Sequence, residues 1–103
     1  MARFIKVAST SDLMPGSGQL VEVEGKQIAL FNIDGNYYAI DDTCPHRGGP
    51  LSEGFIEGEE VACPLHGSRF NIKTGEVLGP PARQGVAKYN TRVVQGTDVE
   101  IEV

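Results

Sequence analysis

The chemistry of this chain is concentrated in two short stretches, CPHRGGP at residues 44–50 and CPLHGSRF at residues 63–70. They contain both cysteines and both histidines of the sequence, as one Cys-x-His pair and one Cys-x-x-His pair. Proline and glycine surround each pair, and these residues favour tight turns over helix or strand. Two thiolates and two imidazoles on two such loops predict a four-ligand metal site, made of Cys44, His46, Cys63 and His66.

Two kinds of metal centre use this ligand set. A structural zinc ion accepts two cysteines and two histidines in a tetrahedron. One kind of [2Fe-2S] cluster carries two histidines in place of two cysteines on one of its irons. Zinc modules usually pair like with like, whereas here each loop has one cysteine and one histidine. This order favours the cluster, because each loop can give its thiolate to one iron and its imidazole to the other. A zinc-binding interaction module without a redox role is the alternative.

The two stretches resemble the Rieske [2Fe-2S] motif, C-x-H-x15–17-C-x2-H, and the likeness extends to a third loop, GPPA at residues 79–82. The resemblance implies one cluster per chain, with Cys44 and Cys63 on its buried iron. It implies that His46 and His66 bind the exposed iron through Nδ1. It also implies the Rieske fold, in which the third loop closes over the cluster.

Further residues bear on the reduction potential through the same resemblance. High-potential Rieske proteins have an extra cysteine in each ligand loop, joined as a disulfide, and a tyrosine hydroxyl directed at a ligand sulfur. Those positions hold Gly49, Leu65 and Phe70 in this chain, so we expect a potential at the low end of the Rieske range. Ser68 keeps a hydroxyl that in the family points to a bridging sulfide, although a loop serine can equally bond its own backbone. Pro80 belongs to the covering third loop.

The strand pattern predicts an all-β fold, an antiparallel β-sandwich or partly open barrel. No stretch has sustained helical periodicity, and short runs of β-forming residues recur between turns. We expect a single domain over residues 1–103, with a small cluster-binding β subdomain inserted at about residues 42–82. The three tyrosines are expected to pack in the sheets: Tyr37, Tyr38 and Tyr89. The expected strands cover residues 4–8, 20–24, 27–33, 37–40, 55–56, 60–62, 69–72, 76–78, 86–94 and 99–103.

Composition limits the classes of partner. The chain of 103 residues has 14 acidic and 9 basic side chains and a formal charge of −5, which argues against nucleic-acid binding. There is no apolar run long enough to span a membrane and no apolar leader, so we expect no membrane association. Both cysteines are assigned to the metal site, which agrees with a reducing cytoplasm.

Two groups of charged side chains lie near the proposed ligands. They are solvated loop residues by default, and a docking site for a redox partner is the alternative. The basic group is Arg47, Arg69 and Arg83. The acidic group is Glu53, Glu57, Glu59 and Glu60.

The resemblance is closest to the ferredoxin components of bacterial aromatic-ring dioxygenase systems. It implies a monomeric one-electron carrier that takes electrons from a flavoprotein reductase and passes them to a terminal oxygenase. Such a carrier is a component of an oxidoreductase and not an enzyme itself. The alternative within the family is the Rieske-like small subunit of an NAD(P)H nitrite reductase, whose partner is the large subunit.

Overall fold

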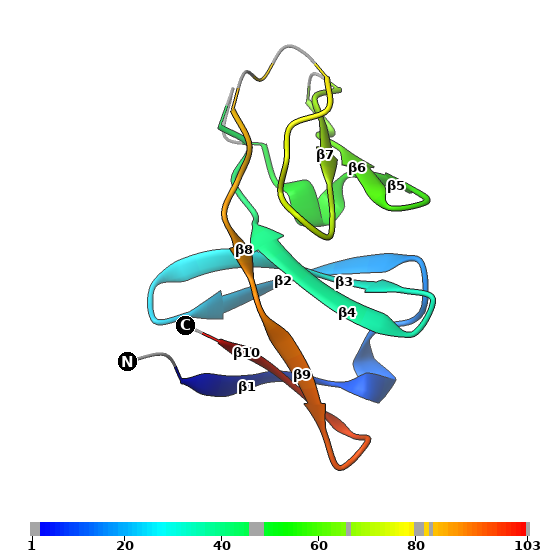
Figure 1. Cartoon of the computed structure of the whole chain (residues 1–103), viewed down its shortest axis with the longest axis vertical. Helices are drawn as coiled ribbons and strands as arrows, with labels where there is room; N and C mark the ends of the chain where they lie inside the picture. Colours follow the sequence, from blue (N-terminus) through cyan, green and yellow to red (C-terminus); the bar gives the residue numbers. More distant parts are fainter. Residues whose placement is uncertain (1–2, 46–48, 66, 80–81, 83, 103) are drawn as a thin grey trace.

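The computed structural model describes residues 3–45, 49–65, 67–79, 82 and 84–102. Over these residues the chain consists of antiparallel strands and two short turns of 3-10 helix, with overall dimensions of 40 × 29 × 17 Å. Three small sheets follow one another along the long axis (Figure 1). The predicted all-β antiparallel fold is confirmed. None of the described helices is long and apolar enough to cross a membrane.

The central sheet separates two hydrophobic cores. Its strands, in spatial order, are β2 (Ser17–Val23), β3 (Lys26–Ile33), β4 (Asn36–Asp41) and β8 (Lys88–Tyr89). Two-residue turns join β2 to β3 and β3 to β4, and both residues of each turn have positive φ. The second is Gly25 in one turn and Gly35 in the other, as a type I′ hairpin prefers. Side chains of β3 alternate between the two cores, which explains why the strand is almost wholly apolar.

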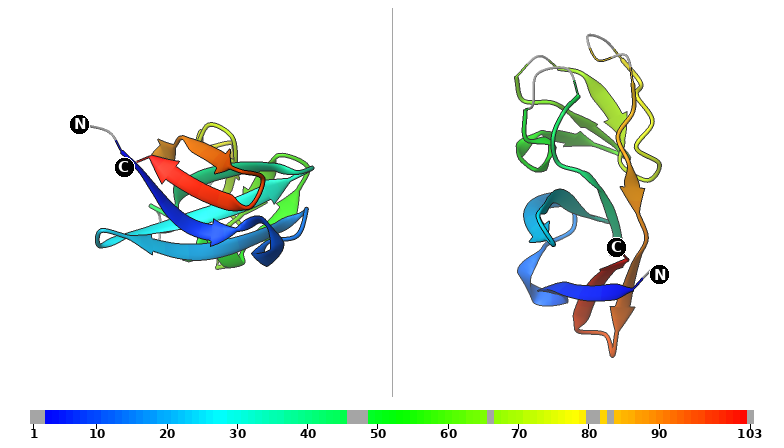
Figure 2. Two further views of the ribbon diagram at one scale, coloured as in Figure 1. Left: turned by 90° about the horizontal axis from the view of Figure 1, so that it is seen from below. Right: turned by 90° about the vertical axis from the view of Figure 1, so that its left-hand side faces the viewer.

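The lower sheet closes one end of the molecule. Its strands, in spatial order, are β1 (Phe4–Ser9), β10 (Asp98–Glu102) and β9 (Thr91–Val94), and a 3-10 turn, η1 (Thr10–Asp12), follows β1. The single strand expected over residues 86–94 is wrong, because the chain changes sheets at Asn90. β8 pairs with β4 and β9 pairs with β10, so this segment runs along the molecule from one sheet to the next (Figure 2).

The upper sheet carries the two cysteine loops. Its strands are β5 (Phe55–Glu57), β6 (Glu60–Ala62) and β7 (Arg69–Asn71), and a 3-10 turn, η2 (Leu51–Glu53), precedes them. The strand expected over residues 76–78 is reduced to one isolated bridge, between Phe70 and Val77. Gly75, which precedes this segment, is bonded elsewhere: its carbonyl accepts the N–H of Val86 at 2.8 Å. The segment therefore does not extend into a regular strand beside β7.

The upper core lies between the central and upper sheets and includes both cysteines. Its other members are aliphatic or aromatic, so the sulfur-bearing loops rest on a rigid apolar base. The buried residues of this core are Ala29, Phe31, Ile33, Ile40, Cys44, Leu51, Val61, Cys63, Phe70, Ile72 and Ala82.

Candidate metal centre

The first cysteine loop begins where β4 ends. Cys44 is 1% exposed, and its N–H donates to the carbonyl of Gly49 at 2.9 Å. A bridge between Thr43 and Pro50 closes the base of the loop. The loop therefore returns on itself and holds the cysteine side chain toward the upper core.

The second loop joins β6 to β7 and has the same closure. Cys63 is 2% exposed, and its N–H donates to the carbonyl of Ser68 at 2.7 Å. The Cys63 carbonyl accepts the N–H of Gly67 at 3.0 Å. In both loops the cysteine amide bonds to the carbonyl five residues further along the chain, so each loop is closed by a hydrogen bond of the same span.

The two loops touch at Gly49. A Cβ placed on this glycine would lie 2.6 Å from Sγ of Cys63 and 3.1 Å from Cγ of Leu65. Only a residue without a side chain allows the backbone of the first loop to approach the second cysteine so closely. Positions 49 and 65, where high-potential Rieske proteins carry their extra cysteines, are therefore neighbours here, and they hold a glycine and a leucine.

Asp42 anchors the base of the first loop and was missed at the sequence level. It is 3% exposed, and its Oδ1 accepts the N–H of Ser52 at 2.7 Å. Its carbonyl accepts the N–H of Leu51 at 2.7 Å, and its own N–H donates to the carbonyl of Gln27 at 3.1 Å. These bonds connect the loop to η2 and to β3. The sequence gives no local signal for this role, because the burial of a carboxylate is evident only in the folded chain.

Ser68 and Phe70 are both completely buried beside the second cysteine. The Ser68 hydroxyl accepts the N–H of Ala82 at 3.0 Å. Phe70 lies in the same apolar core as Cys44 and Cys63. Ser68 is thus bonded to the second cysteine loop and Phe70 shares a core with both cysteines, while their role beside a metal centre is still a prediction.

Three of the predicted site residues lie outside the described residues: His46, His66 and Pro80. Over the described part of the chain, no three His, Cys, Asp or Glu side chains gather in a group suited to a metal ion. The complete ligand set is therefore still a prediction.

The charged groups near the loops are largely paired with each other. Nη1 of Arg69 lies 3.3 Å from Oε1 of Glu60 and 3.7 Å from Oε1 of Glu57, across the upper sheet. Nζ of Lys73 lies 3.0 Å from Oε2 of Glu59, a bond that raises the pKa of the lysine. The acidic group is thus partly neutralised from within the chain. Arg47 and Arg83, predicted to lie near the ligands, are outside the described residues.

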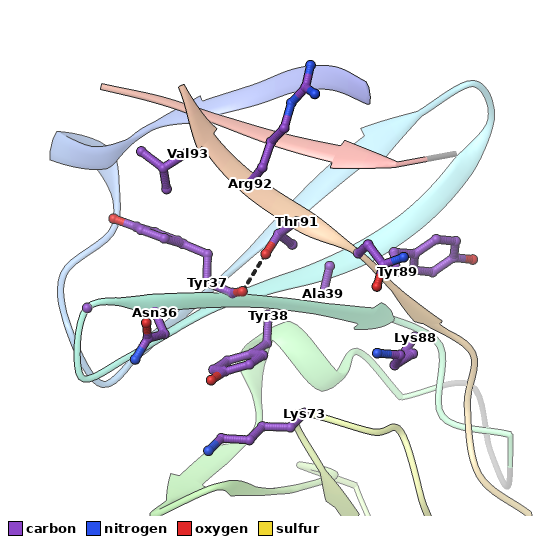
Figure 3. Close-up of a pocket in the computed structure, with 12 residues that line it drawn as sticks. Asn36, Tyr37, Tyr38, Ala39, Lys73, Lys88, Tyr89, Thr91, Arg92 and Val93 are labelled. Atoms are coloured by element: carbon purple, nitrogen blue, oxygen red, sulfur yellow. Dashed lines mark hydrogen bonds between the residues drawn. The ribbon is translucent and has the colours of Figure 1, made fainter. Parts of the chain in front are cut away.

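A groove between β4 and the β8–β9 segment lies away from the cysteine loops (Figure 3). Thr91 Oγ1 donates to the carbonyl of Tyr37 at 2.5 Å across it, and Tyr38 lies beside Lys73 on one side. At the end of β4, the Tyr89 hydroxyl donates to Oδ1 of Asp41 at 2.6 Å. Burial and this bond raise the pKa of Tyr89 to about 12. The tyrosines pack and hydrogen-bond within the sheets, as expected.

The residues of the upper tip fit an iron–sulfur cluster. Two buried cysteines, neither in a disulfide, stand on loops that have the same closing hydrogen bond and that meet at Gly49. Apolar side chains of the upper core surround them, with one buried hydroxyl close by. Thiolates in a dry, hydrogen-bonded pocket are the ligands such clusters use. An antiparallel three-sheet fold with two such loops at one tip defines a Rieske-type protein.

The chain belongs to the Rieske [2Fe-2S] family, whose domain pattern matches residues 3–90. It is 37% identical over 91 residues to the ferredoxin component of the naphthalene 1,2-dioxygenase system of Pseudomonas putida, a match that covers 88% of each chain. Its fold superposes with a TM-score of 0.89 on a solved complex of reduced oxygenase and oxidised ferredoxin in carbazole 1,9a-dioxygenase, at 32% identity over 95% of this chain and 91% of that one. A structure from Mycobacterium tuberculosis, described as an NADH-dependent nitrite reductase small subunit, gives a TM-score of 0.90 at 26% identity over 100% and 96% of the two chains.

These relationships confirm the expected cofactor and class. The chain holds one Rieske [2Fe-2S] cluster rather than a zinc ion, and it is a ferredoxin-type electron carrier. It is an electron-transfer component and not a catalyst in its own right.

Proposed function

We propose that the chain carries single electrons from a flavoprotein reductase to the terminal oxygenase of an aromatic-ring dioxygenase system. The observation that carries the proposal is the meeting of two cysteine loops, each closed by the same kind of backbone bond, at one tip of the molecule. A redox centre at a tip can approach a partner protein without a change in fold. The ferredoxin relatives, one of them solved in a complex with an oxygenase, support this direction of transfer.

Four residues are proposed to hold the cluster: Cys44 and Cys63 through thiolates, and His46 and His66 through imidazoles. When bound, the cluster supplies reversible one-electron chemistry, with a potential that hydrogen bonds to sulfur, charge and solvent exposure tune. Residues 42–82 are proposed to act as the cluster-binding subdomain of a single domain over residues 1–103, with Pro80 in its covering loop.

The residues of the chain keep the cysteine side of the site dry and rigid. Leu51, Val61 and Phe70 are fully buried beneath the cysteines, so water does not reach the sulfurs from below. The backbone closures at Gly49 and Ser68 restrain the two loops. Fixed surroundings reduce the rearrangement that accompanies a change of charge.

The rim of the tip offers apolar contact area. Leu65, in the second cysteine loop, is 56% exposed, and Leu78, just before the third loop, is 44% exposed. Exposed leucines around a redox centre suit transient docking, in which little area is buried and the complex separates quickly. The overall charge of −5 also favours approach to a basic face of a partner.

The low-potential assignment rests on three positions. Gly49 and Leu65 are neighbours, and neither is a cysteine as in high-potential Rieske proteins. Phe70 is buried and has no hydroxyl, whereas those proteins have a tyrosine at the corresponding position. We further propose that the protein acts in the cytoplasm as a monomer.

The test reconstitutes transfer with a purified flavoprotein reductase and a purified terminal oxygenase of an aromatic-ring dioxygenase system. Reduced protein is mixed with the oxygenase in a stopped-flow instrument, and reoxidation of the cluster is followed by its visible absorbance. We expect rapid reoxidation that slows with added salt, and product formation only when all three proteins are present.

The nitrite reductase subunit is the second candidate, favoured by the fold likeness at a TM-score of 0.90. That role requires a stable complex with a large subunit. Isolation of the protein in fixed ratio with such a subunit, together with nitrite-dependent reoxidation, would replace the carrier proposal.

A further inference from the structure

A short antiparallel ladder joins the two sides of the first cysteine loop. The N–H of Cys44 donates to the carbonyl of Gly49 at 2.9 Å, and the carbonyl of Asp42 accepts the N–H of Leu51 at 2.7 Å. A backbone bridge lies between these two bonds. The carboxylate of Asp42 adds one more bond beyond the end of the ladder, since its Oδ1 accepts the N–H of Ser52 at 2.7 Å.

Asp42 also satisfies the beginning of the 3-10 turn η2. The first N–H groups of a helical turn have no partner within the turn itself, and here they belong to Leu51 and Ser52. Pro50, the residue before the turn, has no side-chain oxygen that could accept either of them. Asp42 accepts both, one through its carbonyl and one through its carboxylate. Asp42 is 3% exposed, so its bond to Ser52 is not readily replaced by a bond to water.

The turn η2 is held from its other side by the central sheet. A Cβ placed on Gly18 of β2 would lie 3.1 Å from the carbonyl oxygen of Ser52. The turn therefore rests directly on β2, which is an edge strand of that sheet. Leu51 is completely buried in the upper core. Because η2 is packed in this way, the carboxylate of Asp42 ties the first loop to a fixed part of the molecule.

The ladder also bears on the spacing of the two cysteines. Gly49 closes the first loop on Cys44, and the same residue lies against Sγ of Cys63. If the segment from Gly49 to Ser52 shifts along the ladder, Cys44 changes its position relative to Cys63. Two backbone bonds alone leave the base of such a short ladder free to fray, and the carboxylate bond restrains it.

We infer that Asp42 is a positioning residue, whose carboxylate fixes the first cysteine loop to η2 and so sets the position of Cys44 relative to Cys63. The inference rests on the proposal that these two cysteines bind the cluster. All the residues that carry it are among those the structure describes.

Four variants of the holo-protein test this. Asp42→Ala removes the acceptor and leaves the backbone bonds of residue 42 in place, whereas Asp42→Asn keeps a side-chain oxygen as the conservative replacement. Ser52→Pro removes the donor, and Ser52→Ala keeps the N–H as its matched control.

The first readout is the rate at which visible absorbance disappears in excess iron chelator. We expect Asp42→Ala and Ser52→Pro each to lose the cluster faster, on the order of tenfold. The double variant should be no faster than the faster single variant, since both substitutions remove the same bond. Asp42→Asn and Ser52→Ala should stay near wild type.

Two further readouts report on the loop and on the site. Hydrogen exchange, read by mass spectrometry on the peptide that contains Ser52, should speed up in Asp42→Ala and return to the wild-type rate in Asp42→Asn. The EPR g values of the reduced cluster should shift in Asp42→Ala, because the sulfur of Cys44 is displaced, and should be restored in Asp42→Asn. If Ser52→Pro does not fold, the comparison of Asp42→Ala with Asp42→Asn decides.

Wild-type exchange and wild-type cluster lifetime in Asp42→Ala would overturn the inference. It would also be overturned if Asp42→Asn behaved like Asp42→Ala, since the charge and not the bond would then be responsible. Failure of the ligand proposal has another signature, namely a full cluster in Cys44→Ser.

Discussion

Gly49 lies directly against the sulfur of Cys63, so that a Cβ at position 49 would stand 2.6 Å from Sγ. Residues 49 and 63 belong to different loops, and this contact brings the two halves of the proposed ligand set together. The glycine is also the residue whose carbonyl closes the first loop on Cys44. Position 49 is therefore sensitive to any added atom.

Gly49→Ala tests the contact. The new methyl group must displace either the Cys63 side chain or the first loop, and overpacking of this kind costs about 1–3 kcal/mol. We expect lower iron and sulfide content and faster cluster loss than in wild type. Gly79→Ala is the matched control, because the nearest atom to a Cβ there is Cβ of Arg69 at 3.9 Å. Equal cluster content and lifetime in the two variants would show that the loops are not in contact at Gly49.

Phe70→Tyr tests how the potential is set. Phe70 is completely buried beside both cysteines, and the substitution adds a hydroxyl donor to this apolar core. A donor directed at a ligand sulfur stabilises the reduced state more, since reduction increases the negative charge on sulfur. If the difference is about 1 kcal/mol, the potential rises by roughly 40 mV for one electron. Protein-film voltammetry at fixed pH and salt measures it, and an unchanged potential with an intact cluster spectrum would mean that residue 70 does not face the sulfur.

Tyr89 makes the stability of the folded chain depend on pH in the alkaline range. Its pKa is raised to about 12 from an ordinary value of 10.0 by burial and by the bond to Asp41. Between these values the folded chain keeps a proton that the unfolded chain has lost. Stability from this group is therefore complete below pH 10 and is lost as the pH rises through the folded pKa.

The corresponding experiment compares wild type with Tyr89→Phe in denaturant unfolding across this alkaline range. We expect the stability of wild type to fall more steeply with pH than that of the variant. An ultraviolet titration should show one tyrosine fewer ionising at the high end in the variant. Parallel stability curves would argue against the Tyr89–Asp41 bond.

Much of this fold could be predicted from the residue pattern. Glu24-Gly25 and Asp34-Gly35 form the turns between the expected strands, because glycine adopts the positive φ that such turns require. The nearly continuous apolar run of β3 is typical of a strand in the interior of a sheet, and β3 lies between β2 and β4. Residues 86–94 were predicted as one strand because Asn90 gives no local signal, and only pairing with β4 and β10 shows that the chain changes sheets there.

The residue pattern predicted the candidate ligands but not the hydrogen bonds that support their loops. The spacing of cysteine and histidine in each loop identified the family, and Ser68 and Phe70 lie beside the cysteines. The bonds from Asp42 to Ser52 and from Ala82 to Ser68 join residues 10 and 14 positions apart. Such contacts depend on how the loops fold back on each other, which no local periodicity encodes.

The ligand assignment predicts the behaviour of two further variants. Cys44→Ser and Cys63→Ser each remove one thiolate from the proposed buried iron, so neither should retain a full cluster. Iron and acid-labile sulfide are assayed on the purified variants, with Phe55→Ser on the exposed edge of the upper sheet as a control that should keep both. Wild-type content in either cysteine variant would remove that residue from the ligand set.

The central claim, a cluster bound by two cysteines and two histidines, is tested most directly by pulsed EPR of the reduced protein grown with ¹⁵N-labelled histidine. His46 and His66 are the only histidines of the chain, so every histidine nitrogen signal comes from one of them. We expect two distinct nitrogen couplings to the unpaired electron in wild type. If a cluster persists in His46→Ala or in His66→Ala, that variant should lack one of the two couplings. A reduced cluster that shows no histidine coupling, or only one in wild type, would contradict the account.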